Sequence, residues 1–159
     1  MGGIARALKF IKVPFLGSEE GTLTRVIVGV HEELESKFRT LQFAIFDKQS
    51  NVENLTKIIN QLTRTGDPKN LLDRAKASLL ETQNAVVEME SESQSIDDKL
   101  NLLRRSKVEF TQEATGMVEV TVANYKVRLT KSYGRGQFGL SDENRVVHID
   151  PKGFSGLAN

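Results

Sequence analysis

Two long segments of the chain carry apolar residues on alternating steps of three and four, and a short break separates them. The first segment runs from Leu23 to Leu62 and the second from Leu72 to Phe110. Such spacing places one narrow apolar stripe along the side of an α-helix, as in helices that pair with another helix. The pattern therefore predicts two long helices with a coiled-coil contact between them.

The apolar positions of the stripe form a seam, which Lys48, Thr82, Ser93 and Lys107 interrupt. The seam residues are Leu23, Ile27, Val30, Leu34, Leu41, Ile45, Val52, Leu55, Ile59, Leu62, Leu72, Leu79, Val86, Met89, Ile96, Leu100 and Leu103. A partner arm covers only one stripe of a helix about 60 Å long. We therefore expect several hairpins to associate into a homo-oligomer. The alternative is a single hairpin that packs on its own terminal segments.

The break at residues 63–70 reads Thr-Arg-Thr-Gly-Asp-Pro-Lys-Asn and contains the residues that end one helix and start another. Gly66 can adopt the left-handed conformation after a helix, Asp67 can cap the next helix, and Pro68 suits a first turn. The chain is therefore predicted to fold back on itself, so that residues 22–113 form one antiparallel helical hairpin.

After Gly116 the period of the apolar residues changes from helical to alternating. Val118 to Val122 and Tyr125 to Leu129 each alternate apolar and polar side chains, with Ala123-Asn124 between them. This pattern predicts a β-hairpin. Because two strands alone are marginally stable, we expect a third strand, either from Arg145 to Ile149 or from another copy. Residues 116–159 are thus interpreted as a small β-rich segment with a tail.

Residues 1–21 combine apolar and basic side chains and are interpreted as a docking segment. Ile4, Leu8, Ile11 and Phe15 share one helical stripe, but Pro14 would end any helix at about Val13. The cations of this segment are Arg6, Lys9 and Lys12. The segment is expected to dock on a neighbouring subunit or on the hairpin, and contact with an anionic membrane is the alternative. The predicted fold class is accordingly mainly α, with a small β element after the hairpin.

Composition narrows the class of protein further. The 159 residues, 38% hydrophobic and 27% charged, indicate a folded chain of one domain, or one domain with a small appendage. The lack of cysteine excludes disulfides and thiolate sites. A net charge of +1 provides no overall field for nucleic acid or anionic lipid. No transmembrane segment or signal peptide is expected, because Lys9 and Lys12 interrupt the apolar start. The expected setting is intracellular or a virion.

The string from Gly134 to Gly139 reads Gly-Arg-Gly-Gln-Phe-Gly, which satisfies GxGxxG and looks like the glycine-rich loop of protein kinases. The residues that follow are strand-like instead of helical, and the other kinase motifs would need a far longer chain. We expect a flexible glycine-rich loop between strands. His31 and His148 are the only histidines and lie far apart in the sequence, so no metal site and no cofactor are predicted.

A nucleic-acid site is an alternative hypothesis for the stretch from Val120 to Ser141, which contains no acidic residue. Its cations are Lys126, Arg128, Lys131 and Arg135, and Tyr133 and Phe138 lie among them. Cations neutralise phosphates, and aromatic rings can stack on unpaired bases.

No group of residues has the spacing of a catalytic site, so the predicted function is non-enzymatic. We expect an elongated structural or assembly subunit of a larger complex, with a virion or phage tail as one candidate setting. It would attach through its N-terminal segment and its C-terminal β-rich segment. A peripheral membrane scaffold and a nucleic-acid-binding protein are the alternatives. The expected partners are further copies or other protein subunits, with no small-molecule substrate.

Overall fold

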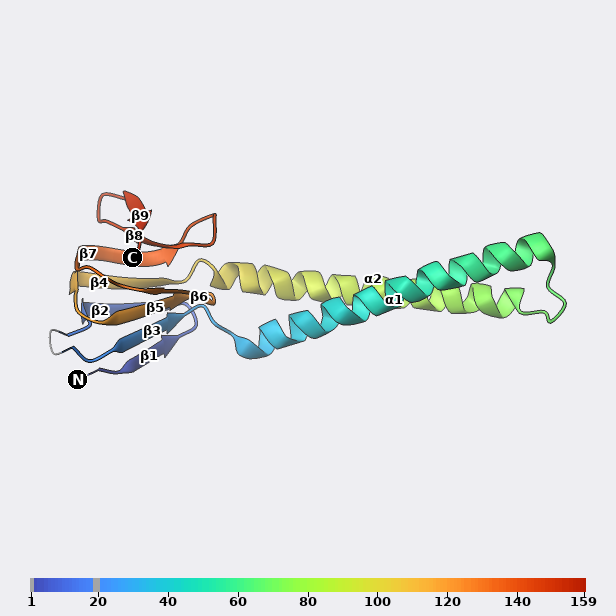
Figure 1. The fold of residues 1–159 in the computed structure, drawn as a ribbon, viewed down its shortest axis with the longest axis horizontal. Helices are drawn as coiled ribbons and strands as arrows, with labels where there is room; N and C mark the ends of the chain where they lie inside the picture. The colour runs from blue at the N-terminus through green and yellow to red at the C-terminus, as the bar shows by residue number, and fades with distance from the viewer. Residues whose placement is uncertain (1, 19–20) are drawn as a thin grey trace. The chain divides into compact units, whose positions relative to one another are not determined.

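The computed structural model describes residues 2–18 and 21–159, which fold as two compact units. One unit is the helical hairpin of residues 32–98. The other, here called the β-module, combines the described residues up to 31 with residues 99–159. The hairpin is therefore an insertion in the chain of the β-module, which contains strands from both sides of it (Figure 1).

The described residues form two helices and nine strands. The elements in chain order are β1 Ile4–Ala7, β2 Phe10–Leu16, β3 Thr24–Val28, α1 Glu32–Thr65, α2 Leu72–Leu103, β4 Lys107–Ala114, β5 Val118–Val122, β6 Tyr125–Arg128, β7 Tyr133–Leu140, β8 Val146–Ile149 and β9 Ser155–Leu157. One sheet has the strand order β1-β3-β5-β6, and the other has the order β2-β4-β7-β8-β9.

The first strands of the β-module are stacked as repeated coils, each of which gives one strand to each sheet. β1 and β2 form the first coil, and β3 and β4 form the second. β3 pairs in parallel with β1 and with β5, and β4 pairs in parallel with β2. The remaining strands, β6 to β9, pair antiparallel with their neighbours and complete the two sheets.

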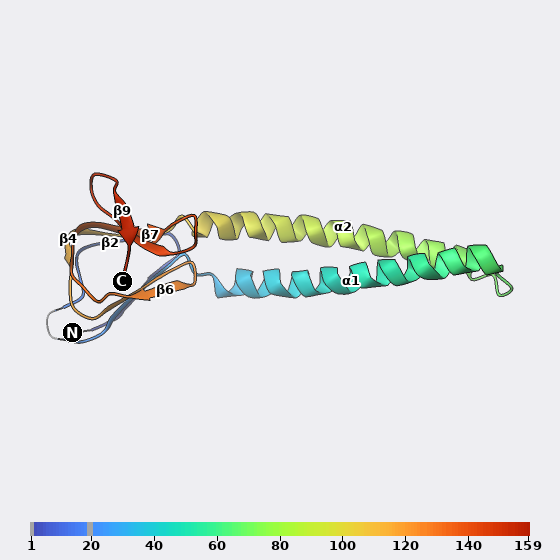
Figure 2. The same ribbon diagram turned by 45° about the horizontal axis from the view of Figure 1, so that its top comes forward.

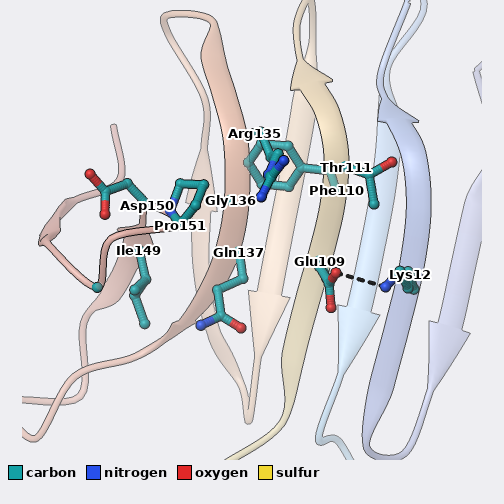
Figure 3. Close-up of a pocket in the computed structure, with 11 residues that line it drawn as sticks. Lys12, Glu109, Phe110, Thr111, Arg135, Gly136, Gln137, Ile149, Asp150 and Pro151 are labelled. Carbon is teal, nitrogen blue, oxygen red and sulfur yellow. Dashed lines mark ion pairs between the residues drawn. The ribbon is translucent and has the colours of Figure 1, made fainter.

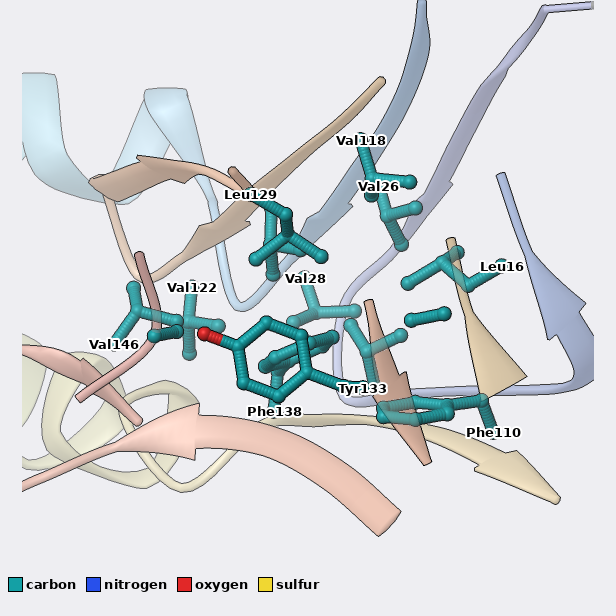
Figure 4. Close-up of a cluster of buried hydrophobic side chains, with 14 residues drawn as sticks. Leu16, Val26, Val28, Phe110, Val118, Val122, Leu129, Tyr133, Phe138 and Val146 are labelled. Carbon is teal, nitrogen blue, oxygen red and sulfur yellow. The ribbon is translucent and has the colours of Figure 1, made fainter. Parts of the chain in front are cut away.

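The core lies between the two sheets, where their inward side chains meet (Figure 4). In the four-stranded sheet, Val26, Val28, Val120 and Val122 are all within 1% of full burial. Neighbouring positions such as Glu119 point outward, because successive side chains of a strand alternate between the two faces. The other sheet contributes inward aromatic residues, and the rings of Phe110 and Phe138 stack with their centroids 5.0 Å apart.

Both ends of the helical insertion close on the corner between β1 and β2. The N–H of Gly29 donates to the carbonyls of Ala7 at 3.3 Å and Leu8 at 3.1 Å. The Ser106 hydroxyl donates to the same Leu8 carbonyl at 3.0 Å, and the N–H of Lys107 donates to the Lys9 carbonyl. The second coil is thereby held in register although residues 29–106 separate its two strands.

The two helices of the hairpin run side by side in both views, as predicted (Figures 1 and 2). Gly66 follows α1 with a φ of 90°, in the left-handed region. Both carboxylate oxygens of Asp67 accept backbone hydrogen bonds, from Leu71 at 2.7 Å and Leu72 at 2.8 Å. Asp67 therefore caps α2 as expected, although Pro68 precedes the helix instead of lying in its first turn.

The predicted fold class, mainly α with a small β element, is wrong. The protein is mixed α/β, with two sheets of four and five strands and with strands on both sides of the hairpin. The residues from Phe10 to Leu16 form a strand whose alternate positions face the core, and its apolar residues were misread as a helical stripe. Pro14 is tolerated there because β2 lies at the edge of its sheet.

The first helix also begins later than predicted, and the second helix ends earlier. Leu23, Ile27 and Val30 precede α1, and Ile27 lies in β3. Phe110 lies in β4, since α2 ends at Leu103. These residues match the heptad spacing by coincidence. A short apolar run rich in β-branched residues, such as Val26 to Val28, fits a buried strand as well as a helix, so the spacing alone did not distinguish the two.

Replacement of Gly29 by alanine is expected to destabilise the β-module by about 2–4 kcal/mol. Gly29 has a φ of 71°, and a Cβ there would lie 2.4 Å from the Leu103 carbonyl oxygen. The measurement is urea unfolding followed by tyrosine fluorescence, which reports on the β-module because Tyr125 and Tyr133 are the only tyrosines and Trp is absent.

The matched control is Gly153→Ala. Gly153 has a φ of 87°, but a Cβ there would meet nothing within 4 Å, so its cost should be limited to about 1 kcal/mol of backbone strain. Equal costs for the two variants would show that the close approach at Gly29 does not matter.

Candidate functional site

The seam residues of the hairpin are shielded from solvent within one chain. From Leu34 to Ile96, every predicted seam position is half-buried or buried, and Ile45, Val86 and Ile96 are at most 9% exposed. Most of the others remain only half-buried. Each helix of the antiparallel pair thus covers the apolar stripe of the other. Contact of the seam with further copies remains a prediction.

One polar interruption of the seam, Ser93, takes part in a hydrogen bond between the two helices. Ser93 is 4% exposed, and its hydroxyl accepts a hydrogen bond of 2.6 Å from the Gln42 side chain on the other helix. Gln49 donates to Glu90 at 3.1 Å across the same pair of helices. Because these bonds join residues at fixed positions, they favour one alignment of α1 against α2.

Four large apolar side chains of the hairpin, away from the seam, are more than 60% exposed, and their exposure was not predicted from the sequence. They are Phe43, Phe46, Leu80 and Val87, with exposed fractions of 75%, 68%, 61% and 65%, and are called the hairpin patch below. Leu80 and Val87 lie on one face of α2, since seven residues separate them. The signal in the sequence was available, because each residue is apolar and falls outside the heptad positions.

A groove of about 530 Å³ crosses the hairpin beside this patch. The lining residues are Gln49, Val52, Glu53, Gln83, Val86 and Val87. Phe46 precedes Gln49 and Glu53 by three and seven residues, so all three lie on one face of α1. The same side of the hairpin therefore presents an aromatic ring from α1, apolar side chains from α2 and a groove between them.

The β-module has a second depression, of about 520 Å³, on the five-stranded sheet (Figure 3). Its charged residues are Lys12, Glu109, Arg135 and Asp150. Lys12 and Glu109 form an ion pair of 2.9 Å, and Asp150 accepts two backbone hydrogen bonds in the turn before β9. Because the four charges balance and three are already engaged, this depression lacks the convergent polar groups of a catalytic site.

The four cations of the nucleic-acid hypothesis are distributed over both sheets. Lys126 and Arg128 lie on β6 of the four-stranded sheet, where Lys126 pairs with Glu119 at 3.4 Å. Lys131 lies 5.3 Å from the centre of the Tyr133 ring, and Arg135 lies on β7 of the other sheet. Tyr133 and Phe138 are 8% and 0% exposed, so these two rings are packed in the core instead of being available to bases.

The glycine-rich string is part of strand β7, and the prediction of a flexible loop is wrong. A Cβ at Gly136 would lie 2.5 Å from Nε2 of His148 and 2.5 Å from the Ile149 carbonyl oxygen. Gly136 thus allows the ring of His148 to lie among the aromatic side chains of the core. The ring centroids of His148 and Tyr133 are 4.8 Å apart.

Burial lowers the pKa of His148 from its ordinary value of 6.5, and this effect outweighs the opposing influence of the Gly134 backbone and the Asp150 carboxylate. The Nε2 atom is buried and has no hydrogen-bond partner among the described residues. The neutral ring therefore suits the folded state, since a proton on Nε2 would be buried without an acceptor.

Two further observations concern the residues that the structure describes, 2–18 and 21–159. No group of three or more histidine or acidic side chains in this range is arranged to hold a metal ion. Neither helix in it combines the length and the apolar character needed to span a membrane.

Acidification below about pH 6.5 is expected to destabilise the β-module through His148. The unfolded chain takes up a proton at this pH before the folded chain does, so stability falls from pH 6.5 down to the lowered pKa of the folded state. The stability advantage of the wild type over His148→Asn should therefore shrink as the pH falls, as measured by urea unfolding with tyrosine fluorescence.

The control for this experiment is His31→Gln, which removes the other histidine but retains His148 and should therefore keep the loss of stability that His148 causes on acidification. A constant difference between wild type and His148→Asn from pH 7.5 to pH 5 would contradict the assignment.

Comparison with known proteins gives a match to one family. The family model is described as the flagellar assembly protein A (FapA) beta solenoid domain, and it matches residues 1–146. No curated protein and no solved structure gives a significant match. The matched residues include the coils of parallel strands, the inserted hairpin and the antiparallel strands β6 and β7. The chain therefore belongs to the FapA family of flagellar assembly proteins, as a member with its beta solenoid domain.

Proposed function

We propose that the protein is a non-enzymatic assembly module whose hairpin binds helices of further subunits during flagellar assembly. The observation that carries this proposal is the hairpin patch, in which four large apolar residues are more than 60% exposed. Large exposed apolar side chains on a helical surface favour contact with another protein. The family assignment gives the setting, since the family is one of assembly proteins.

The first partner that we propose for this surface is the hairpin of a second copy. Two hairpins that face each other through their patches would form a four-helix arrangement, in which the half-buried seam edges also become covered. Helices from other subunits of the assembly are the second candidate. No small-molecule substrate is required by either arrangement.

The proposed setting and the attachment surfaces differ from those expected from the sequence. The match concerns flagellar assembly and gives no support to a virion or phage tail. The N-terminal residues and the C-terminal strands are parts of one β-module, so attachment through it would use a single folded body. Membrane and nucleic-acid binding remain alternatives with less support, because the basic N-terminal segment forms strands and two of the rings near the cations are buried.

The proposal is tested with the double variant Phe43→Ser/Phe46→Ser. Light scattering should give a wild-type mass of at least twice 17.7 kDa, and the double variant should be monomeric with unchanged helicity by circular dichroism. A control variant, Asn54→Ser/Lys57→Ser, changes two exposed polar residues of the same helix and should associate like the wild type.

The role in assembly is tested by complementation in the source organism. Deletion of the gene should reduce the number of flagella per cell, as counted by electron microscopy. The control variant should restore them and Phe43→Ser/Phe46→Ser should not. Full restoration by the double variant, at equal protein level, would contradict the proposed role of the patch.

A further inference from the structure

The first coil of the β-module has an open edge in both sheets. β1 is the end strand of the four-stranded sheet and β2 is the end strand of the five-stranded sheet. Because these two strands belong to the same coil, both open edges lie at the same end of the stack. Within the described residues, each of the two strands pairs with only one neighbour, β3 or β4.

The backbone groups at this end are arranged to accept another parallel strand. The carbonyls of Gly3 and Ala7 accept hydrogen bonds on the β3 side, from Arg25 and Gly29. By alternation, Ile4 and Arg6 direct their N–H and C=O groups to the open edge. Before β2, the Lys9 carbonyl accepts a hydrogen bond from the N–H of Lys107. By the same alternation, the backbone N–H and C=O groups of Phe10 and Lys12 point to the open edge.

The end of the core is apolar as well. Ala5, Ala7, Ile11 and Val13 occupy the inward positions of the first coil, by their register with Val26, Val28, Val108 and Phe110. Ala5 is exposed, and the other three are only half-buried. Stacked repeats normally end in a unit with a polar outer face, because each repeat covers the apolar layer of the next. The first coil lacks such a face.

The outward side chains of this coil add further exposed apolar area. Ile4, Leu8, Phe10 and Phe15 have exposed fractions of 68%, 52%, 47% and 52%. An unpaired, apolar sheet edge is a template for a further strand. In this coil two such edges are present together, so the natural occupant has two strands joined by a corner.

We propose that the open end of the first coil binds a β-coil of another polypeptide, strand-corner-strand, whose strands run parallel to β1 and β2. The bound strands would extend the hydrogen-bond ladders that already join the first and second coils. This binding involves the β-module alone and does not depend on the association of hairpins.

Charge indicates the chemistry of this partner. Residues 2–18 contain Arg6, Lys9 and Lys12 and no acid, so a second copy placed end to end would add cations and no acid from its own first coil. Within the module, neighbouring strands alternate in charge: Lys12 pairs with Glu109, and Arg25 pairs with Glu119 at 3.3 Å. A partner coil with acidic residues would extend this alternation, which disfavours a second copy of this chain.

The test uses a fluorescent peptide made from residues 4–16 with the changes Arg6→Glu, Lys9→Glu and Lys12→Glu. This peptide keeps the apolar pattern of the first coil and supplies the opposite charge. Fluorescence anisotropy should show binding to the full chain at least tenfold tighter than that of the unmodified peptide. A scrambled peptide with the same acidic composition should also bind at least tenfold more weakly, because it lacks the alternation.

Two protein variants locate the binding. Ala5→Lys places a charge at the open end of the core and should weaken binding at least tenfold, although its added charge favours the acidic peptide. Thr121→Lys adds the same charge on the outward face of the central strand β5 and should bind like the wild type. Phe43→Ser/Phe46→Ser should also bind like the wild type, which separates this inference from the proposed function.

Hydrogen exchange provides a measurement that does not depend on a variant. The amides of Ile4 and Lys12 should exchange at least tenfold more slowly when the acidic peptide is bound, since the new strands would accept their N–H groups. Equal affinity for the scrambled peptide, unchanged exchange at both amides, or a wild-type dimer that Ala5→Lys dissociates would each overturn the proposal. The last result would identify a second copy as the occupant.

Discussion

The corner at Leu8 and Lys9 connects the first coil to both ends of the helical insertion. Its carbonyls accept hydrogen bonds from Gly29 on entry to the insertion and from Ser106 and Lys107 on return. Closure of residues 29–106 would be costly in entropy for a flexible chain. Here the two arms of the hairpin, of 34 and 32 residues, return the chain through their own seam, so β4 can take its place in the second coil.

The hairpin was predictable because its signals are local. The heptad spacing extends over both helices, and Gly66 and Asp67 mark the turn between them. The seam positions within residues 32–98 are buried or half-buried, as expected of an apolar stripe between two helices. These features depend on contacts between helices that are adjacent in the sequence, and the periodicity records such contacts directly.

The two sheets were not predictable in the same way, because their pairing is non-local. β3 and β4 were assigned to the helices since Ile27 and Phe110 continue the heptad count beyond the true helix ends. Their neighbours in the ladder, β1 and β2, lie within the N-terminal segment that was expected to dock elsewhere. No spacing within a short window reveals that Val28 lies between Ala7 and Val122. The β5–β6 hairpin was found because its partners adjoin in the sequence.

The candidate surfaces also divide into those that local sequence patterns predict and those that depend on non-local pairing. Seam residues were identified from periodicity, whereas the hairpin patch consists of apolar residues that break the period, and such residues gain meaning only when their exposure is known. The open coil end was hidden because Ala5, Ile11 and Val13 read as ordinary apolar positions until the register placed them in the last layer of the core. Surfaces of this kind are properties of the assembled ladder, so they can be inferred only after the order of the strands is known.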